Sequence, residues 1–528
     1  MTWKNSGFKE LDSTVLQCLF ITHDLYAELD KGKDVCMVFL DVSKAFDRVW
    51  HRGLLFKLER IGVKGQLLKW FSSYLHDRKQ RVVIKGQASD WKSVNAGVPQ
   101  GSVLGPLLFL VYVNDIVDNI SSNISLFADD TSIYRTINSN IDVGILNSDL
   151  QKISDWGKKW LVNFNAQKTK YMLFSSRKDN ISQIDIIFDN TQVTRESYHR
   201  HLGIVFSENL SWKNHVDYIF TKIARRMNVL KSIQRRVPRA CLENIYECMI
   251  LPIIEYADVV YDNLSKQLSN ELEKIQRQAA LACTGAYRHT QHQAILRELG
   301  WIPLDLRRRC HRLNLFYKIL NNKTPNYIKS ILPRTVFERT NYNLRNRENL
   351  TVPQFRKKLC YNSFLPKTIR DWNELPLIIR QSTTYDTFKT NIKQKFYINK
   401  NKLFKYTSGP ASIHICRMRL GLSGLNMHRF LYNFIDTPKC LLCGASIEDS
   451  VHFFLLCPRY AAQRNILLAQ LAPLLSLEMR YNDILTSNVY QREFVKYVLN
   501  GVESFTLPQN IEIFKHVQQF INDTKRFV

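Results

Sequence analysis

The chain has 528 residues, of which 74 are Lys or Arg and 47 are Asp or Glu, so its formal net charge is +27. A hydrophobic content of 45% is typical of a folded protein, and the length allows about two to four domains. So large an excess of positive charge indicates a polyanionic partner, either nucleic acid or an anionic membrane surface. The longest apolar run, residues 105–113, is too short to cross a bilayer, and no signal-peptide pattern opens the chain. We therefore expect an intracellular protein that contacts nucleic acid and no membrane.

Eleven cysteines, an odd number, are mostly scattered through apolar segments, which is typical of reduced thiols in an intracellular protein. Near the C-terminus, however, Cys440, Cys443, His452 and Cys457 follow the spacing Cys-x2-Cys-x8-His-x4-Cys. Three thiolates and one imidazole at such spacing predict a zinc site. The alternative is three buried thiols and one surface histidine.

In chain order, the apolar pattern first predicts a helix over residues 11–29. A continuous apolar run, residues 35–40, then predicts a strand buried on both faces, which delivers Asp41 at its C-terminal end. Three more elements are expected before residue 97: helices over 43–61 and 67–75, and a hairpin of 82–84 with 91–94.

The segment Gly97–Ser102 is a Gly- and Pro-rich loop that leads into a helix ending near Asp118. Its glycines allow a close backbone approach to a ligand, although an ordinary strand-to-helix connection fits the pattern equally well. Two short apolar runs then flank Asp129 and Asp130, which predicts a β-hairpin with both carboxylates at its tip. Asp is also simply a good turn residue, so the hairpin alone is weak evidence for a metal site.

The following residues predict an amphipathic helix over 141–161, a strand over 171–174, and a small antiparallel sheet from 184–188, 193 and 204–206. Beyond Trp212 the chain is helical and basic. Solvated helix faces explain much of this charge, but the excess of one sign favours a surface that follows a phosphate backbone. Residues 321–405 are interpreted as a loosely organised connecting region.

Asp41, Asp129 and Asp130 come together only if their strands are neighbours in one sheet. Carboxylates so placed can hold two divalent ions roughly 4 Å apart, the arrangement that activates a 3′-hydroxyl and stabilises a pyrophosphate leaving group. Mg²⁺ suits such a site because it prefers oxygen ligands and keeps substrate phosphate oxygens in its shell.

Three motifs carry a resemblance to a known family. Residues 39–51 (Phe-Leu-Asp-Val-Ser-Lys-Ala-Phe-Asp-Arg-Val-Trp-His), 97–106 (Gly-Val-Pro-Gln-Gly-Ser-Val-Leu-Gly-Pro) and 127–130 (Phe-Ala-Asp-Asp) resemble polymerase motifs A, B and C in order and spacing. The chain resembles the reverse transcriptase of a non-LTR (LINE-type) retrotransposon, truncated at its N-terminus. Similarity to such elements continues in Trp-Asn-Glu-Leu-Pro at 372–376 and in the Cys/His set.

The resemblance implies an α+β fold: a right-hand polymerase palm, built as an antiparallel sheet with helices, with truncated fingers, a helical thumb and a small C-terminal zinc-binding module. The implied divisions are a fingers remnant (1–30), the palm (31–175), a primer-grip hairpin (176–210), a basic helical thumb (211–335), a connecting region (336–435) and a zinc-knuckle-like module (436–528).

The resemblance also assigns roles at the reacting centre. Asp41 and Asp129 would be the principal Mg²⁺ ligands, with Asp130 beside them. Lys168, in the pattern Asn-x-x-x-x-Lys-Thr, would protonate the departing pyrophosphate. Lys170 is a competitor for that role.

Other residues would contact the substrates. Phe46 would act as a steric gate that excludes a ribose 2′-hydroxyl, its alternative role being that of a core aromatic. Gln100 and Gly101 would lie against the template and the incoming nucleotide, and residues 198–203 resemble the primer-grip hairpin.

We therefore expect an RNA-directed DNA polymerase, a nucleotidyltransferase that uses an RNA template, a DNA primer or target, dNTPs, two Mg²⁺ ions and a structural Zn²⁺. Its expected location is the nucleus and cytoplasm, and a separate endonuclease would nick the target. One alternative is a catalytically inactive remnant or domesticated nucleic-acid-binding protein. Another is a group II intron-type maturase, which the Phe-Ala-Asp-Asp form and the Cys₃His tail disfavour.

Overall fold

A computed structural model describes most of the chain. The described residues are 5–175, 184–234, 236–335, 348–397, 409–475, 484 and 486–527. The chain divides into two compact units: unit 1 (Met1–Tyr218, Ala257–Ser265 and Arg308–Lys389) and unit 2 (Ile219–Tyr256, Lys266–Arg307 and Thr390–Val528). Parts of five predicted divisions lie outside the described residues: 1–4 of the fingers remnant, 176–183 of the primer-grip segment, 235 of the thumb, 336–347 and 398–408 of the connecting region, and 476–483, 485 and 528 of the C-terminal module.

Unit 1 is built on a five-stranded sheet with the strand order β11-β8-β1-β7-β6. Central β1 (Asp34–Leu40) runs antiparallel to both of its neighbours, and β11 is parallel to β8. The other strands are β6 (Asn123–Phe127), β7 (Asp130–Ile137), β8 (Lys170–Phe174) and β11 (Thr194–Arg195).

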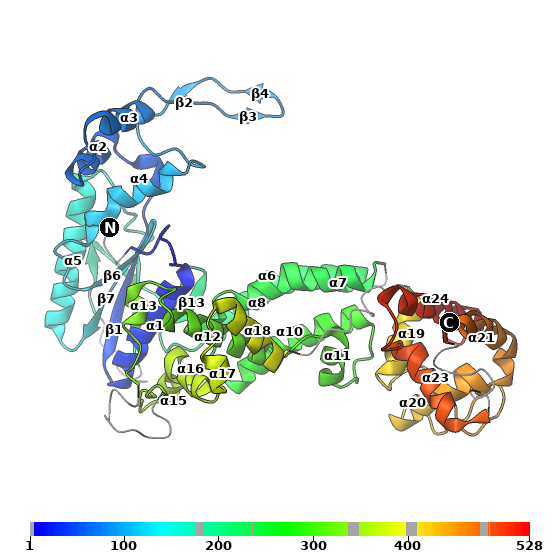
Figure 1. Ribbon diagram of the computed structural model, residues 1–528. Coiled ribbons are helices and arrows are strands. Elements are labelled where there is room, and N and C mark those ends of the chain that lie inside the picture. Colours follow the sequence, from blue (N-terminus) through cyan, green and yellow to red (C-terminus); the bar gives the residue numbers. More distant parts are fainter. Residues whose placement is uncertain are drawn as a thin grey trace. The chain divides into compact units, whose positions relative to one another are not determined.

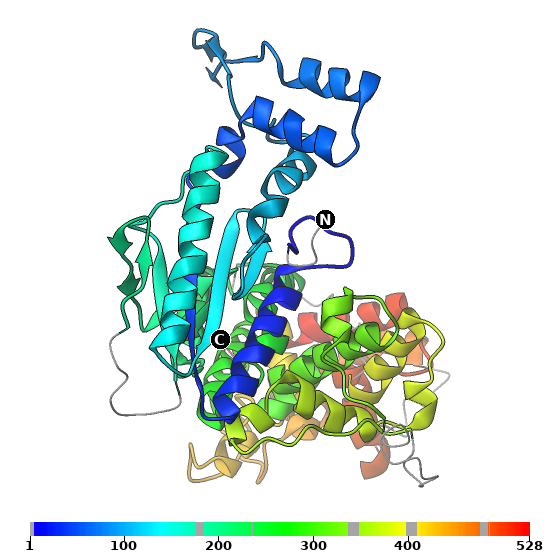
Figure 2. The ribbon, with the colours of Figure 1, turned by 90° about the vertical axis from the view of Figure 1, so that its left-hand side faces the viewer.

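Both faces of β1 are buried, as its unbroken apolar run predicts. Because side chains alternate along a strand, Cys36, Val38 and Leu40 share one face, where they form a core with the helix α5 (Asn140–Lys159). In Figures 1 and 2 the sheet lies between α5 and the N-terminal helix α1 (Thr14–Asp30). Two helices therefore cover the two faces of the sheet. The C-terminal end of β1 and the turn of the β6–β7 hairpin lie together at one end of the strands.

Residues 43–61 of unit 1 do not form the single helix that the sequence predicts. The segment forms a short 3₁₀ turn, η1 (Ala45–Arg48), and α2 (His51–Arg60) begins only after an extended Val49. The reason is a pair of long-range hydrogen bonds: Gly97 N donates to the Val49 carbonyl and Val98 N to the Phe46 carbonyl, each at 2.8 Å. The remaining elements here are α3 (Gly65–Leu75), β2 (Lys79–Gln80), β3 (Val83–Ile84), β4 (Gln87–Ala88), β5 (Lys92–Ser93), α4 (Leu104–Val113) and η2 (Asn114–Val117).

The observed strand pairing also differs from two of the predicted sheets. Strand β3 pairs with β4 and β5 pairs with β2, so residues 91–94 do not face 82–84. The predicted single small sheet after residue 184 is instead two separate two-stranded sheets: β9 (Ile187–Phe188) with β10 (Thr191–Gln192), and β12 (Tyr198–His201) with β13 (Ile204–Ser207).

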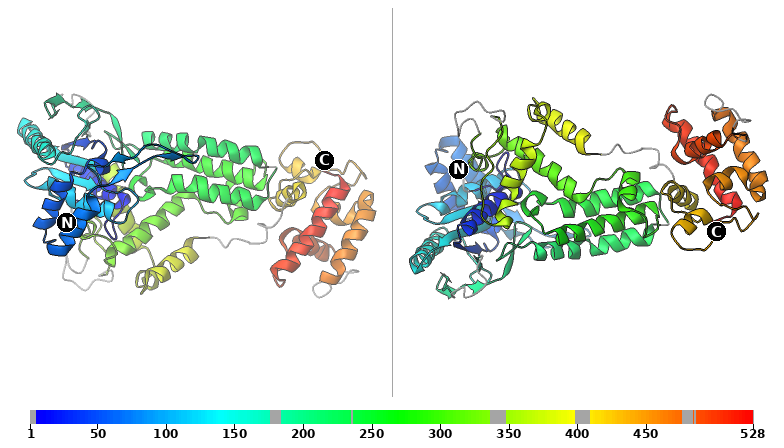
Figure 3. Two further views of the ribbon diagram at one scale, coloured as in Figure 1. Left: turned by 90° about the horizontal axis from the view of Figure 1, so that it is seen from above. Right: turned by 90° about the horizontal axis from the view of Figure 1, so that it is seen from below.

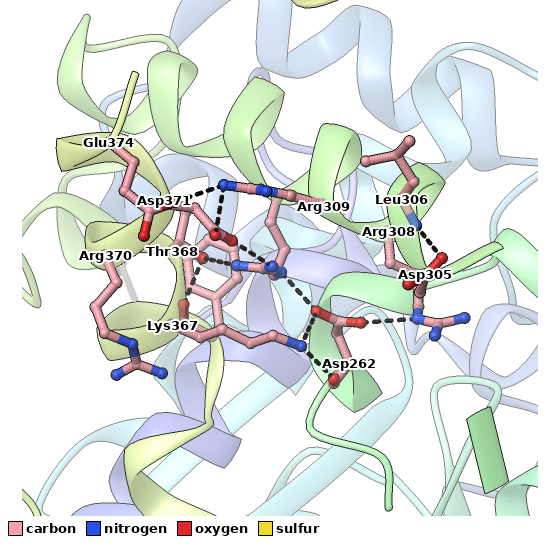
Figure 4. A network of polar contacts seen from close by, with 12 residues as sticks. Asp262, Asp305, Leu306, Arg308, Arg309, Lys367, Thr368, Arg370, Asp371 and Glu374 are labelled. Atoms are coloured by element: carbon pink, nitrogen blue, oxygen red, sulfur yellow. Dashed lines mark hydrogen bonds and ion pairs between the residues drawn. The ribbon is translucent and has the colours of Figure 1, made fainter. Parts of the chain in front are cut away.

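The described part of the predicted connecting region folds into helices rather than loose chain. Unit 1 takes in α13 (Asn326–Lys329), α15 (Lys358–Tyr361), α16 (Phe364–Asn373), α17 (Leu377–Arg380) and the first turn of α18 (Tyr385–Phe396). A buried charge network ties α16 to α12 (Leu304–Leu320) and to the short segment Ala257–Ser265 (Figure 4). Buried Asp262 pairs there with Arg308, Arg312 and Lys367 at 2.6–2.7 Å.

Unit 2 contains two groups of helices. The first comprises most of α6 (Lys213–Ile233), α7 (Arg239–Ile245), η3 (Tyr246–Ile250), α8 (Leu251–Glu255), α10 (Lys266–Thr284) and α11 (His292–Leu299). The second is drawn in gold to red in Figure 3, around its own apolar core, and comprises α19 (Pro410–Arg419), α20 (Asn426–Leu431), α21 (Ala461–Leu475), α23 (Asn488–Asn500) and α24 (Leu507–Thr524). No helix in the described part of the chain is long and apolar enough to cross a membrane.

Candidate functional site

The three predicted carboxylates gather at one edge of the unit 1 sheet. Leu40, the last residue of β1, pairs with Thr131 of β7. Asp41, which follows Leu40, and Asp130, which precedes Thr131, therefore face each other at the ends of neighbouring strands. Asp129 occupies the two-residue turn between β6 and β7, where the preceding Ala128 has a positive φ of 56°. The sheet register therefore brings the three carboxylates together, which the sequence analysis had to assume.

Electrostatics shows that these carboxylates interact. Burial raises the pKa of Asp130, and the negative charges of Asp129 and Asp41 raise it further. A cation between the side chains would remove this repulsion, and a set of carboxylate oxygens suits Mg²⁺. Among the described residues, the Cys/His group near the C-terminus is the one set of three or more candidate metal ligands that lies ready for an ion, and the three aspartates do not form such a compact set.

The N-terminal residues pack directly against the acidic hairpin. Asn5 forms a parallel bridge with Leu126, and Ser6 N donates to the Leu126 carbonyl at 2.9 Å. A Cβ atom added to Gly7 would lie 2.5 Å from the Ala128 backbone nitrogen. Only glycine allows so close an approach at this position, and sequence reasoning did not anticipate the contact.

Of the two candidate lysines, Lys168 is the one beside the carboxylates. Its Nζ lies 3.8 Å from Asp41 Oδ2, with 70% of the side chain exposed. The loop that carries it is fixed to the strand end, because Asn165 N donates to the Asp41 carbonyl at 2.8 Å. Lys170 lies instead within β8, opposite Phe39 of β1.

The glycine-rich loop lies against the segment that follows β1. Gln100 Nε2 donates to Asp47 Oδ1 at 2.7 Å, a partner that the sequence analysis missed although Asp47 stands in the same motif as Asp41. Gly97 has a φ of 94°, and a Cβ atom there would lie 2.8 Å from the Asp47 carbonyl oxygen. Gly101, also at positive φ, is exposed, and a Cβ atom added to it would meet no other atom within 4 Å.

Phe46 is half-buried beside these loops. Its ring stacks on Phe109 of α4 at a centroid distance of 4.5 Å and meets the edge of Phe8 at 6.4 Å. The structure thus supports the role of a packed aromatic and leaves part of the ring accessible from the site.

The β12–β13 hairpin approaches the same edge. His199 stacks on Phe39 of β1 at a centroid distance of 4.1 Å, and the buried ring of His201 lies 5.3 Å from that of Phe39. Burial lowers the pKa of His201 to about 3, so its imidazole is neutral at physiological pH. His199 and Arg200 partly offset the rise in the pKa of Asp130, which places this hairpin within electrostatic reach of the carboxylates.

The predicted zinc ligands converge in unit 2. The ligand atoms of Cys440, Cys443, His452 and Cys457 lie within 4.8 Å of one another, and Cys443 Sγ is 3.3 Å from His452 Nε2. A tight turn shapes the first pair of thiols, because Gly444 N donates to the Cys440 carbonyl at 2.9 Å and Gly444 has a φ of 76°. Soft thiolates with one imidazole in a nearly buried cluster form a donor set that fits Zn²⁺.

The thiols of the Cys/His group differ in acidity. A backbone hydrogen bond from Ala445 lowers the pKa of Cys443, whereas burial raises that of Cys457 to about 11. Nearby Glu448 is 1% exposed and pairs with Arg526, which ties the ligand loop to the C-terminal end of the chain.

Comparison with known proteins supports the same reading of unit 1. Residues 4–219 match the family model for "Reverse transcriptase (RNA-dependent DNA polymerase)". The chain is similar to the RNA-directed DNA polymerase from mobile element jockey of Drosophila melanogaster, at 31% identity over 56% of this chain and 33% of the relative. It is also similar to the probable RNA-directed DNA polymerase from transposon BS of the same species, at 27% identity over 56% of this chain and 34% of the relative.

A third relative extends over more of the chain. The retrovirus-related Pol polyprotein from type-1 retrotransposable element R1 2 of Nasonia vitripennis is 23% identical over 77% of this chain and 96% of the relative. Among solved structures, telomerase of Candida tropicalis matches with a TM-score of 0.34 and 12% identity, covering 62% of this chain and 52% of that one. The chain spans about a third of the length of the jockey and BS relatives. Residues 4–219 thus match a reverse transcriptase domain, and the relatives that the chain resembles are polymerases of retrotransposable elements.

Proposed function

We propose that this protein is an RNA-directed DNA polymerase that adds dNTPs to a DNA primer on an RNA template during retrotransposition. The observation that carries the proposal is the meeting of Asp41, Asp129 and Asp130 at one sheet edge with Lys168 beside them. A carboxylate cluster with an adjacent cation is what template-directed phosphoryl transfer requires. Such catalysis rests almost entirely on positioning and on electrostatic stabilisation of the developing charge.

In this proposal Asp41 and Asp129 hold two Mg²⁺ ions, with Asp130 beside them. When bound, the ions activate the primer 3′-hydroxyl and stabilise the charge on the transferred phosphorus and on pyrophosphate. Burial and the neighbouring carboxylates raise the pKa of Asp130, and a bound cation would oppose that rise by favouring the charged form of this carboxyl group. Lys168 supplies the proton that pyrophosphate takes up as it leaves.

Residues around the carboxylates would select and align the substrates. Phe46, braced by Phe109, forms a rigid wall against which a ribose 2′-hydroxyl would clash. Gln100, oriented by Asp47, and the exposed Gly101 line the side where template and nucleotide would lie. The β12–β13 hairpin, stacked on β1 through His199, is suitably placed to hold the primer end.

The second proposed element is a structural zinc site at Cys440, Cys443, His452 and Cys457. Its donor set fits Zn²⁺, and a metal at this position would hold the ligand loop against the core of the surrounding helices. We propose that the resulting module contacts template RNA or target DNA.

Asp129→Asn tests the polymerase proposal. Incorporation of labelled dNTPs is measured with the full chain, Mg²⁺ and a DNA primer on an RNA template. Because metal-assisted stabilisation provides several kcal/mol, the variant should lose at least about a thousandfold in rate. Asp155→Asn removes an exposed carboxylate from α5 and is the matched control, with an unchanged rate expected.

Two outcomes would contradict the proposal. Persistence of activity in Asp129→Asn would remove the assignment of the metal site. Absence of incorporation by the unaltered chain, with RNA binding retained, would favour the non-catalytic nucleic-acid-binding alternative.

A further inference from the structure

Unit 2 contains a large cavity lined by cations. Its volume is about 720 Å³, and it lies at α6, α10, the loop after α10, and α19. Five of its described lining residues are Lys or Arg and none is Asp or Glu: Lys231, Lys274, Arg277, Arg288 and Arg417. We call this site the basic cavity. Its volume falls within the range of about 300–1,000 Å³ that is typical of ligand sites and is far larger than one phosphate ion needs.

Part of the wall of the basic cavity is the loop after α10, which two arginines hold in place. Arg277 Nη2 donates to the carbonyl oxygens of Arg288 at 2.7 Å and Thr290 at 2.9 Å. Arg417 Nε donates to the Gly285 carbonyl at 2.8 Å, and its guanidinium lies 4.0 Å above the ring of Tyr287. These contacts fix both guanidinium groups at the cavity wall. Neutral carbonyl partners orient Arg277 without cancelling its charge.

The fit of α19 against this loop shows that the wall is closely packed. Gly285 has a φ of 65°, and an added Cβ atom would lie 2.7 Å from Ile413 Cγ2 of α19. The loop and the helix therefore meet without room for a side chain. A second cavity of about 380 Å³ adjoins this contact and shares Gly285, Ile413 and Arg417 with the basic cavity.

Other arginines of unit 2 form ion pairs with acidic side chains. Arg239 and Arg419, both nearly buried, pair with the carboxylate of Glu298 at 2.8 and 2.5 Å. Lys274 and Arg288, by contrast, are exposed and form no ion pair among the residues that the structure describes. The fold pairs its buried guanidinium groups with acids but leaves a cluster of like charges facing the basic cavity. Like charges so close together repel, and a bound anion would relieve that repulsion.

We propose that the basic cavity binds the phosphodiester backbone of a nucleic-acid strand, at a site in unit 2 separate from the carboxylates of unit 1. This inference rests on the proposed function, which supplies the nucleic acid. The volume favours a strand of linked nucleotides over free phosphate or pyrophosphate. The Tyr287 ring, with Arg417 lying over it, adds an aromatic surface of the kind on which a base can stack.

The test is the salt dependence of RNA binding. A fluorescent single-stranded RNA of about 20 nucleotides is titrated with the full chain by anisotropy, without dNTPs or Mg²⁺. The test variant Lys231→Gln/Lys274→Gln/Arg288→Gln changes three exposed positions of the basic cavity. The matched control Arg356→Gln/Lys389→Gln/Lys393→Gln removes the same charges from exposed positions before α15 and on α18, outside the helices that surround the Cys/His group. Thermal unfolding confirms that both variants fold.

Each phosphate contact contributes about 0.7 to the slope of log K against log salt for a single strand. The test variant should therefore lower the slope by about 2, while the control changes it by less than about half as much. Equal slopes for the two variants would overturn the proposal, because net charge alone would then explain the binding. Loss of RNA affinity in inorganic phosphate, but not in chloride of equal ionic strength, would overturn it in favour of a free-phosphate site. A chain that binds RNA in this way but incorporates no dNTP would keep the basic cavity and refute the polymerase.

Discussion

Lys168 Nζ lies 3.8 Å from Asp41 Oδ2, which joins a loop after α5 to the end of β1. The pair is exposed, so its contribution to stability is small, about 0–1 kcal/mol. The pair matters for position, because it places the proposed proton donor next to a proposed metal ligand with an exposed side chain that can turn toward a substrate. The hydrogen bond from Asn165 N to the Asp41 carbonyl keeps the loop at this distance.

Replacing Lys168 should therefore impair the chemical step and leave substrate binding nearly intact. Lys168→Ala is expected to lower kcat by about a hundredfold or more, because a positioned general acid contributes factors of this size. KM for dNTPs should change little, so the measurement is kcat and KM for one dNTP on one primer and template. Lys170→Ala, on β8, is the matched control and should retain its kcat. A kcat lowered by Lys170→Ala and not by Lys168→Ala would reverse the assignment.

Phe46→Val should relax the discrimination between dNTPs and NTPs. Without the Phe46 ring, the site would admit a ribose 2′-hydroxyl. Loss of a clash of about 1–3 kcal/mol corresponds to a change of about tenfold to a hundredfold in selectivity for dNTPs over NTPs. The measurement is kcat/KM for dATP and ATP on one primer and template. If Phe46 is only a core aromatic, both values will fall together and their ratio will stay the same.

Chelation should unfold the helices around the Cys/His group without unfolding unit 1. Zinc binding to such sites contributes about 10 kcal/mol or more to folding, far above the stability of most small domains. Metal analysis of the purified protein should find one zinc per chain, lost in Cys443→Ser. Cys241→Ser, an exposed thiol elsewhere in unit 2, should keep the zinc. Full zinc content in Cys443→Ser would contradict the ligand set.

Asp262 should be the acid on which the stability of unit 1 depends at low pH. Burial alone would raise its pKa, but the charges of Arg312, Lys367 and Arg308 outweigh burial and lower it (Figure 4). A carboxyl group whose folded pKa lies below its unfolded value of about 3.9 stabilises the fold above that pH. This stabilisation is lost as the pH falls through the folded pKa.

Asp262→Asn should reduce the free energy of unfolding by about 3–5 kcal/mol at pH 7, because it leaves buried cations without their counter-charge. The difference from the unaltered protein should shrink as the pH falls below about 4. Denaturant unfolding at several pH values measures both effects, and Asp90→Asn, at an exposed position, is the control. A difference that stays constant down to pH 2 would show that Asp262 does not titrate in this range.

Much of the site could be predicted because its pieces are local. The apolar run before Asp41, the acidic hairpin and the Cys/His spacing each lie within about a dozen residues, where alternation and turn chemistry determine structure. The predicted helix over 43–61 failed for the opposite reason. Its carbonyls accept hydrogen bonds from Gly97 and Val98, and no periodicity within the segment records that partner.

By itself, the sequence determined the order of the three motifs, the identity of the carboxylates and the chemistry of the proposed zinc ligands. Only the tertiary structure placed Lys168 rather than Lys170 beside Asp41, paired Gln100 with Asp47, and surrounded Asp262 with cations. These relationships join segments far apart in the chain, so they depend on sheet register and helix packing. The same holds for the basic cavity, whose charges come from three separate stretches of sequence and become a site only where the fold brings them together.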